Sequence, residues 1–152
     1  MVPPTVPGNP DKAVPFAALK TLLVLEDHPS VMMVLRLMLE QYNVIEASTA
    51  EQALRLFTDH GRKIDLLVAD VTLPTSSGIQ VALLLRSEVP DLPVILTSGY
   101  PVSAWNDPDS ADLERLGSNA VAILQKPFQS KALSDAVREL IGTAPSEATG
   151  TA

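Results

Sequence analysis

Four short apolar runs, each leading directly into polar side chains, limit what this chain of 152 residues can fold into. The runs lie at residues 21–25, 65–69, 93–96 and 120–125. Continuous apolar runs of this length, bounded by polar turns, are typical of strands buried on both faces of a parallel sheet. Amphipathic segments of helix length lie between them. This alternation predicts an α/β fold, in which helices cover both faces of one parallel sheet.

The apolar runs and the amphipathic segments also predict the order of the elements. We expect strands at residues 21–26, 43–47, 64–69, 92–97 and 120–125. We expect helices at residues 29–41, 50–60, 78–88 and 130–141, and a shorter one at about 109–116. Pro29 suits the first turn of the first helix, and Thr49 is a start signal for the second.

Acidic, hydroxyl and ammonium groups follow the expected strands directly. In chain order they are Glu26 and Asp27, Asp70, Thr97 and Ser98, and Lys126. Functional groups of a parallel sheet gather at the carboxyl ends of its strands, so these side chains should meet at one edge. Three clustered carboxylates repel one another, and a divalent cation relieves that repulsion. The sequence therefore predicts a metal and phosphoryl site.

Taken in order, these motifs resemble the receiver domain of bacterial two-component response regulators, over about residues 20–142. The matching segments are Leu-Glu-Asp at 25–27, Asp-Val-Thr-Leu-Pro at 70–74, Thr-Ser-Gly-Tyr at 97–100 and Lys-Pro-Phe at 126–128. Each motif is common alone, but all four at successive strand ends form a strong signal. The resemblance implies a doubly wound, five-stranded sheet in the flavodoxin-like order 2-1-3-4-5.

The resemblance implies a phosphoryl switch, which catalyses only its own phosphorylation and dephosphorylation. Asp70 would be the nucleophile that forms an aspartyl phosphate, and Lys126 would pair with a phosphoryl oxygen. Mg²⁺ would be held by Glu26, Asp27, Asp70 and the backbone carbonyl of Thr72. The donor would be a sensor histidine kinase or a histidine phosphotransfer protein. The family pattern also implies a cis Lys126–Pro127 bond.

A hydroxyl at the end of the fourth strand would hydrogen-bond the phosphoryl group and so move its loop. Counting five residues from Pro93, as in typical receivers, selects Ser98 over Thr97.

The residue three positions before the lysine is usually aromatic and swings inward when the hydroxyl moves. Here it is Ile123, which departs from the family pattern. Tyr100 and Trp105 are the aromatic residues that could substitute for it.

The first expected helix has more apolar residues than one core face needs. A period of 3.6 residues places four of them on the core face: Val31, Val34, Leu35 and Met38. Met32, Met33 and Leu37 would then point outward. In the family this helix is where the histidine-bearing bundle docks, so Met32 and Met33 are the expected docking residues. The alternative is an ordinary scatter of exposed apolar residues.

The composition limits the kinds of partner and the cellular location that we expect for this chain. A formal charge of −7 argues against direct binding of nucleic acid. The apolar stretches are much shorter than the roughly 18 residues of a membrane span. The absence of cysteine excludes disulfides and thiolate metal sites. The N-terminus lacks the pattern of a secretory signal, so we expect a cytoplasmic protein.

The chain divides into three expected parts. Residues 1–18 are proline-rich and lack periodicity, which indicates a flexible arm. Residues 19–142 would form the receiver domain, and residues 143–152 a disordered tail. No output domain is expected after residue 142, which favours a stand-alone receiver that acts on an unidentified output protein as a switch, shuttle or phosphate sink. The sequence leaves open whether it forms a homodimer.

Three other functions fit the sequence less well. A metal-dependent phosphohydrolase with an aspartyl nucleophile usually has a second acid two residues later, where this chain has Thr72. A degenerate receiver that serves only as a binding module is disfavoured because Asp70 and Lys126 are intact. A flavin-binding protein of the same topology would need a phosphate cradle where residues 26–30 are acidic.

Overall fold

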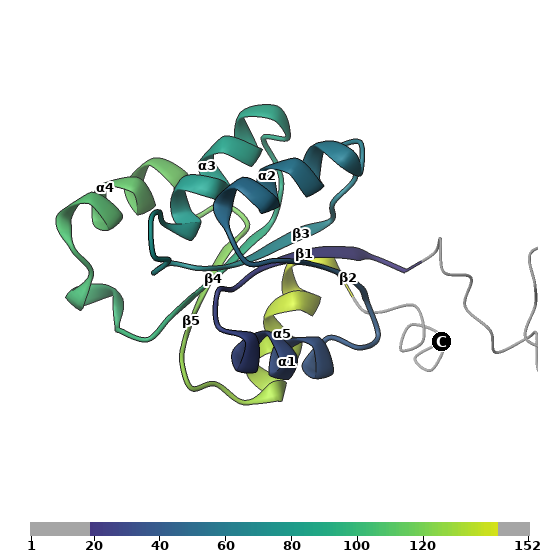
Figure 1. Ribbon diagram of the computed structural model, residues 1–152. Helices are drawn as coiled ribbons and strands as arrows, with labels where there is room; N and C mark the ends of the chain where they lie inside the picture. Colours follow the sequence, from purple (N-terminus) through teal and green to yellow (C-terminus); the bar gives the residue numbers. More distant parts are fainter. Residues whose placement is uncertain (1–18, 143–152) are drawn as a thin grey trace, which may run out of the picture.

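The computed structural model describes residues 19–142, so the arm and tail expected at 1–18 and 143–152 lie outside the described residues. Five parallel strands form one sheet in the order β2-β1-β3-β4-β5, which confirms the predicted topology (Figure 1). The strands are β1 (Thr21–Leu25), β2 (Asn43–Ala47), β3 (Leu66–Asp70), β4 (Val94–Ser98) and β5 (Val121–Gln125).

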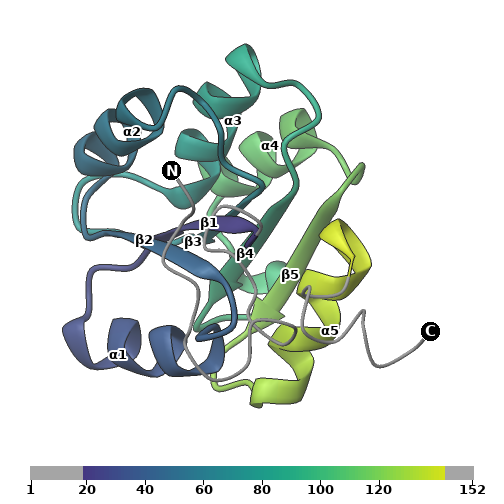
Figure 2. The same cartoon turned by 90° about the vertical axis from the view of Figure 1, so that its right-hand side faces the viewer.

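Helices cover both faces of the sheet, as Figures 1 and 2 show. On one face lie α1 (Pro29–Met38) and α5 (Ser130–Ile141). On the other lie α2 (Ala50–Asp59), α3 (Gly78–Glu88) and α4 (Asp107–Leu116), with a short 3₁₀ turn, η3 (Val102–Ala104), before α4. No helix within residues 19–142 is long and apolar enough to cross a membrane.

Two apolar cores lie on the two sides of the sheet. Successive side chains of a strand point to opposite faces, so Leu22 and Val24 of β1 pack with α1 and α5, whereas Leu23 and Leu25 pack with the other helices. All five residues of β3 are buried. This burial on both faces explains why the central strands read as continuous apolar runs.

The orientation of α1 differs from the prediction. Met32 is only 7% exposed and packs in the core with Leu35, whereas Val34 is 47% exposed. The prediction that Met32 points outward and Val34 inward is therefore wrong. Residues 31–35 are all apolar, so more than one face of this helix satisfies a 3.6-residue period. Tertiary packing selects the face that carries Met32.

The helix expected at 109–116 begins two residues earlier, at Asp107. Asn106 is its N-cap, and the side-chain oxygen of Asn106 accepts a hydrogen bond of 2.8 Å from the backbone N–H of Asp109. Asparagine followed by proline in the first turn is a start signal that the loop-like composition of the segment conceals.

Gly78 should be the glycine least tolerant of substitution. A Cβ at this position would lie 2.3 Å from the backbone oxygen of Asp70 and 2.8 Å from Cβ of Ala69. We expect Gly78→Ala to lower the free energy of unfolding by about 3 kcal/mol, because such overpacking displaces backbone. Gly99→Ala is the control, since nothing lies within 4 Å of its added Cβ. Urea unfolding of both variants measures the difference, and equal stability would contradict this account of the close approach.

Candidate functional site

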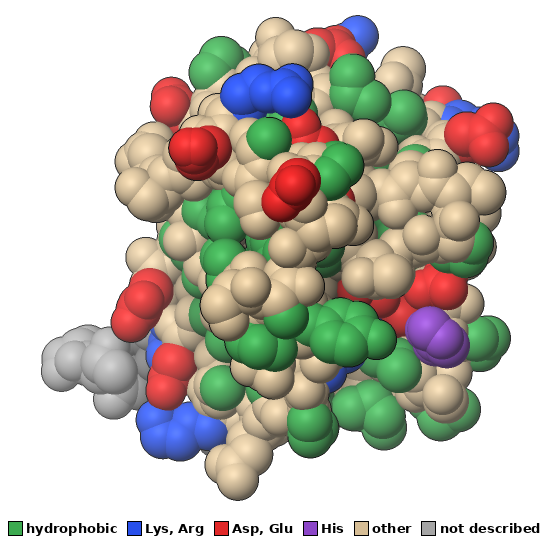
Figure 3. Space-filling model, turned by 90° about the vertical axis from the view of Figure 1, so that its left-hand side faces the viewer, with side chains coloured by type: hydrophobic (Ala, Val, Ile, Leu, Met, Phe, Trp, Pro, Cys, Tyr) green, Lys and Arg blue, Asp and Glu red, His purple; other side chains and the backbone are tan. Residues whose placement is uncertain are grey.

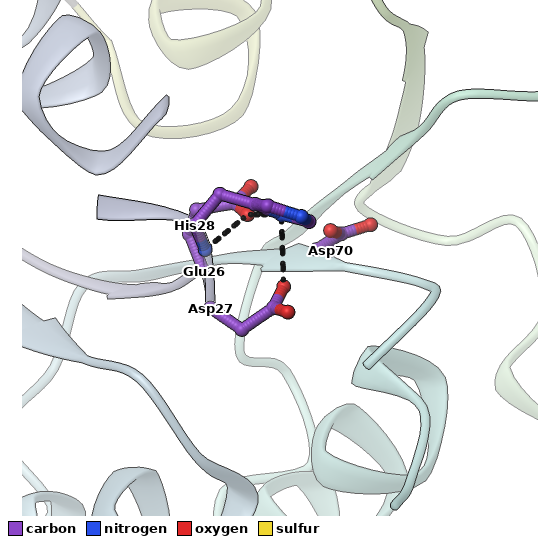
Figure 4. Close-up of side chains that lie close together, drawn as sticks. All are labelled: Glu26, Asp27, His28 and Asp70. Carbon is purple, nitrogen blue, oxygen red and sulfur yellow. Dashed lines mark hydrogen bonds and ion pairs between the residues drawn. The ribbon is translucent and has the colours of Figure 1, made fainter. Parts of the chain in front are cut away.

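Four strands end at the same edge of the sheet and bring the predicted site residues together. Glu26 and Asp27 follow β1, and Asp70 is the last residue of β3. Carboxylate and imidazole atoms of Glu26, Asp27, His28 and Asp70 lie within 4.8 Å of one another. Figure 4 shows these side chains converging at the ends of β1 and β3.

Lys126 closes the cluster from the end of β5. Its Nζ donates hydrogen bonds to Oε1 of Glu26 at 2.8 Å and to Oδ2 of Asp70 at 3.1 Å. Both carboxylates are buried, so one ammonium group is shared between two desolvated acids. The Lys126–Pro127 bond is cis, as the resemblance implies.

The acidic cluster fits a hard divalent cation. Oδ1 of Asp27 is buried and has no hydrogen-bond donor, although Nδ1 of His28 lies 3.3 Å from it. A buried oxygen without a donor is costly, and a cation would satisfy it. All the carboxylate donors offer oxygen, which suits Mg²⁺.

His28 is a site neighbour that sequence reasoning missed. Its side chain is exposed, but its backbone N–H donates to Oε2 of Glu26 at 3.1 Å. Its ring Nδ1 lies 3.2 Å from the same oxygen. Its place directly after the acid pair was the only available signal.

The two predicted switch hydroxyls lie at the end of β4, where Thr97 pairs with Asp70 of β3 and the backbone N–H of Lys126 donates to the backbone oxygen of Ser98. Ser98 and Thr97 are both buried. The Ser98 hydroxyl donates to the backbone oxygen of Tyr100 at 2.8 Å and accepts from the backbone N–H of Tyr100 at 3.0 Å. The indole N–H of Trp105 lies 3.2 Å from the same hydroxyl oxygen. Ile123 is exposed on β5.

The comparison with known families agrees with this geometry. The sequence matches the family model described as response regulator receiver domain over residues 22–138. The chain belongs to this family.

Two proteins resemble the chain in sequence, and a solved receiver domain resembles it in structure. The sensor kinase CckA of Brucella abortus is 32% identical over 133 residues, which cover 86% of this chain and 13% of the kinase. Response regulator GtcR of Aneurinibacillus migulanus is 34% identical over 72% of this chain and 42% of the regulator. This receiver therefore spans less than half of either relative. A receiver domain structure from Clostridium thermocellum has a TM-score of 0.69 at 28% identity and covers 81% of this chain and 94% of its own.

Burial and charge set the protonation of the receiver's central groups. Burial raises the pKa of Asp70 above its usual value, and Lys126 offsets only part of this effect. Burial would also raise the pKa of Glu26, but hydrogen bonds from Lys126 and His28 outweigh it, and this pKa is lowered. Burial would lower the pKa of Lys126, but its bonds to Glu26 and Asp70 raise it instead. Asp70 is therefore the group whose charge is least well compensated.

The raised pKa of Asp70 predicts that its charge destabilises the metal-free receiver. The folded state holds the Asp70 proton more tightly than the unfolded state. The loss of stability caused by the Asp70 charge is therefore complete above the pKa that Asp70 has in the folded state, and it disappears below the pKa that Asp70 has in the unfolded state. We expect Asp70→Asn to raise the melting temperature at pH 7 in EDTA, by on the order of 3 °C for each kcal/mol removed.

Thermal unfolding followed by circular dichroism tests this expectation. The gain should shrink as the pH is lowered, because Asp70 of the wild type then takes up a proton. It should also shrink when Mg²⁺ is added at pH 7. An Asp70→Asn receiver that melts below the wild type in EDTA at pH 7 would contradict the assigned electrostatics.

An apolar surface lies next to the acidic cluster. On α1, Met33 is 54% exposed and Leu37 is 63% exposed. A groove of about 170 Å³ runs from this helix to the lysine and is lined by Val31, Val34, Leu35, Met38, Lys126, Pro127 and Phe128. In the space-filling view of Figure 3, acidic side chains and a histidine lie together with hydrophobic side chains beside them.

Proposed function

We propose that this receiver accepts a phosphoryl group on Asp70 from a phosphohistidine and passes the signal on through protein contacts. The shared ammonium of Lys126 is the observation that carries the proposal. The Lys126 ammonium lies 3.1 Å from Oδ2 of Asp70. A positive charge is therefore in contact with the carboxylate that would receive the phosphoryl group.

The transfer needs an in-line nucleophile and neutralisation of charge on the phosphoryl oxygens. A carboxylate oxygen of Asp70 forms the new P–O bond as the P–N bond of the donor breaks. The leaving imidazole nitrogen keeps the bonding pair and takes up a proton. Lys126 shifts its hydrogen bond from Asp70 to a phosphoryl oxygen, while the backbone N–H of Thr72, which donates to Oδ1 of Asp70 at 3.1 Å, keeps the carboxylate oriented.

The proposal includes Mg²⁺, held by Glu26, Asp27, Asp70 and the backbone carbonyl of Thr72. When bound, the ion supplies positive charge to the phosphoryl oxygens. The buried Oδ1 of Asp27 supports the assignment. Glu26 already accepts hydrogen bonds from Lys126 and His28, so its further role is to hold the lysine in place.

The donor would be a sensor histidine kinase or a histidine phosphotransfer protein that docks on α1. Met33, Val34 and Leu37 are exposed and, with the adjoining groove, form an apolar surface that reaches Lys126. We call these three residues the α1 patch. It replaces the pair predicted from the sequence, because Met32 is buried. The cytoplasmic location, the stand-alone arrangement and the output partner stay predictions.

Phosphoryl transfer from a small donor tests the proposal without a partner protein. Incubation with acetyl phosphate or phosphoramidate and Mg²⁺ should add one phosphoryl group, and EDTA should prevent the addition. Hydroxylamine should remove the group, because an acyl phosphate is cleaved by this nucleophile. A label that forms equally in EDTA, or that survives hydroxylamine, would refute the proposal.

A further inference from the structure

The Ser98 hydroxyl is fully occupied by the segment that follows it. A hydroxyl has one proton to donate and two lone pairs to accept. Its proton goes to the backbone oxygen of Tyr100, and its lone pairs receive the N–H groups of Tyr100 and Trp105. Within residues 19–142, the Ser98 hydroxyl makes no hydrogen bond to Asp70 or Lys126.

Trp105 joins this hydroxyl to α4. Its indole N–H is shared between the Ser98 hydroxyl and the backbone oxygen of Tyr100, at 3.2 Å each. The ring is half-buried and packs against the core on the α3 and α4 side of the sheet. The next residue, Asn106, is the N-cap of α4. A movement of the indole would therefore reach the start of α4 directly.

The side chain at position 123 cannot make such a link. Ile123 has no hydrogen-bonding group and lies exposed on β5. Trp105 is the only tryptophan of the chain, and it makes the only side-chain hydrogen bond to the Ser98 hydroxyl within the described residues.

We infer that Trp105 is a positioning residue, which holds the Ser98 hydroxyl away from Asp70 and is released when Asp70 is phosphorylated. This inference rests on the proposed function. To reach a phosphoryl oxygen, the hydroxyl must give up its bond to the Tyr100 oxygen. The indole then loses one of its two hydrogen-bond acceptors, the Ser98 oxygen, and keeps only the Tyr100 oxygen. An interaction present in only one of two states shifts the equilibrium toward that state. The indole contact thus opposes phosphorylation, and its loss passes the change to η3 and α4.

The fluorescence of Trp105 reports on this step in the unaltered protein. Beryllium fluoride with Mg²⁺, a non-covalent phosphoryl mimic, should shift the emission to longer wavelength and increase quenching by acrylamide. Asp70→Asn should show neither change. If calorimetry shows that the mimic binds but emission and quenching do not change, the inference is overturned and the proposed function is not. No binding to the wild type would overturn the proposed function together with it.

Removal of the indole N–H gives an independent test. Trp105→Phe keeps an aromatic ring but loses the donor, so it should bind the mimic about two- to tenfold more tightly, the range that one neutral hydrogen bond supplies. Val102→Ala in the same segment is the matched control and should bind as the wild type does. In a Ser98→Ala background, Trp105→Phe should have no further effect. Equal or weaker binding by Trp105→Phe, or an equal gain in the Ser98→Ala background, would overturn the inference.

Discussion

Replacing Lys126 with methionine should lower the rate of phosphorylation by acetyl phosphate at least about 100-fold. Methionine keeps the length of the side chain but removes the only cation that pairs with Asp70 among the described residues. Removal of one group that stabilises charge in a transition state typically costs a factor of about 100 to 1000. The rate of phosphoryl incorporation at saturating Mg²⁺ measures the effect.

Lys131→Met is the matched control. Lys131 lies exposed on α5 and pairs with Asp135, so its replacement removes the same charge outside the site and should leave the rate unchanged. Because Glu26 loses a buried partner in the Lys126 variant, circular dichroism must show that the protein is folded at the assay temperature. A folded Lys126→Met receiver with the wild-type rate would contradict the role of this lysine.

Charge on the α1 patch should block transfer from a kinase. Met33→Glu combined with Leu37→Glu should lower kinase-dependent phosphorylation by about 10- to 100-fold, because each well-buried apolar contact contributes about 1–3 kcal/mol. Phosphorylation by acetyl phosphate should barely change, since the acids and the lysine remain in place. Parallel assays with a phosphorylated cognate kinase and with acetyl phosphate separate the two effects.

Leu84→Glu provides the control for added charge. Leu84 is 52% exposed on α3, close to the exposure of Met33, but it lies on another helix. The Leu84→Glu variant should be phosphorylated by either donor at the wild-type rate. Equal loss with both donors in the α1 variant would indicate a damaged site, and no loss with the kinase would exclude the α1 patch as the docking surface.

The sheet and the grouping of the site residues could be predicted because both follow from strand order. Buried parallel strands are apolar throughout, and their ends are marked by polar residues. The ends of β1, β3 and β5 share one edge, so Glu26, Asp70 and Lys126 had to lie near one another. No contact between side chains was needed for that prediction.

The features that the sequence did not reveal depend on packing between elements. The face of α1 could not be chosen from periodicity, because residues 31–35 are all apolar. The contact between Trp105 and Ser98 joins a buried strand end to a segment without periodicity. The ring position of His28 depends on how the chain turns after β1. Each of these is decided by three-dimensional fit, which a pattern of residue types does not contain.

The two carboxylates at the centre of the site differ in a way that only the structure shows. The sequence places Glu26 and Asp70 at strand ends but does not indicate how strongly the charge of each is stabilised. In the fold, Glu26 accepts from both Lys126 and His28, and its pKa is lowered, whereas burial raises the pKa of Asp70. Glu26 is thus suited to hold a cation in place, and Asp70 retains the less stabilised charge that a nucleophile needs.

The position of the phosphoryl group tests the central claim most directly. The receiver is incubated with acetyl phosphate and Mg²⁺, and the modified residue is then located by tandem mass spectrometry in the wild type and in Asp70→Asn. We expect one phosphoryl group, on Asp70, in the wild type and none in the variant. A group on any other residue of the wild type, or one that persists in Asp70→Asn, would contradict the central claim.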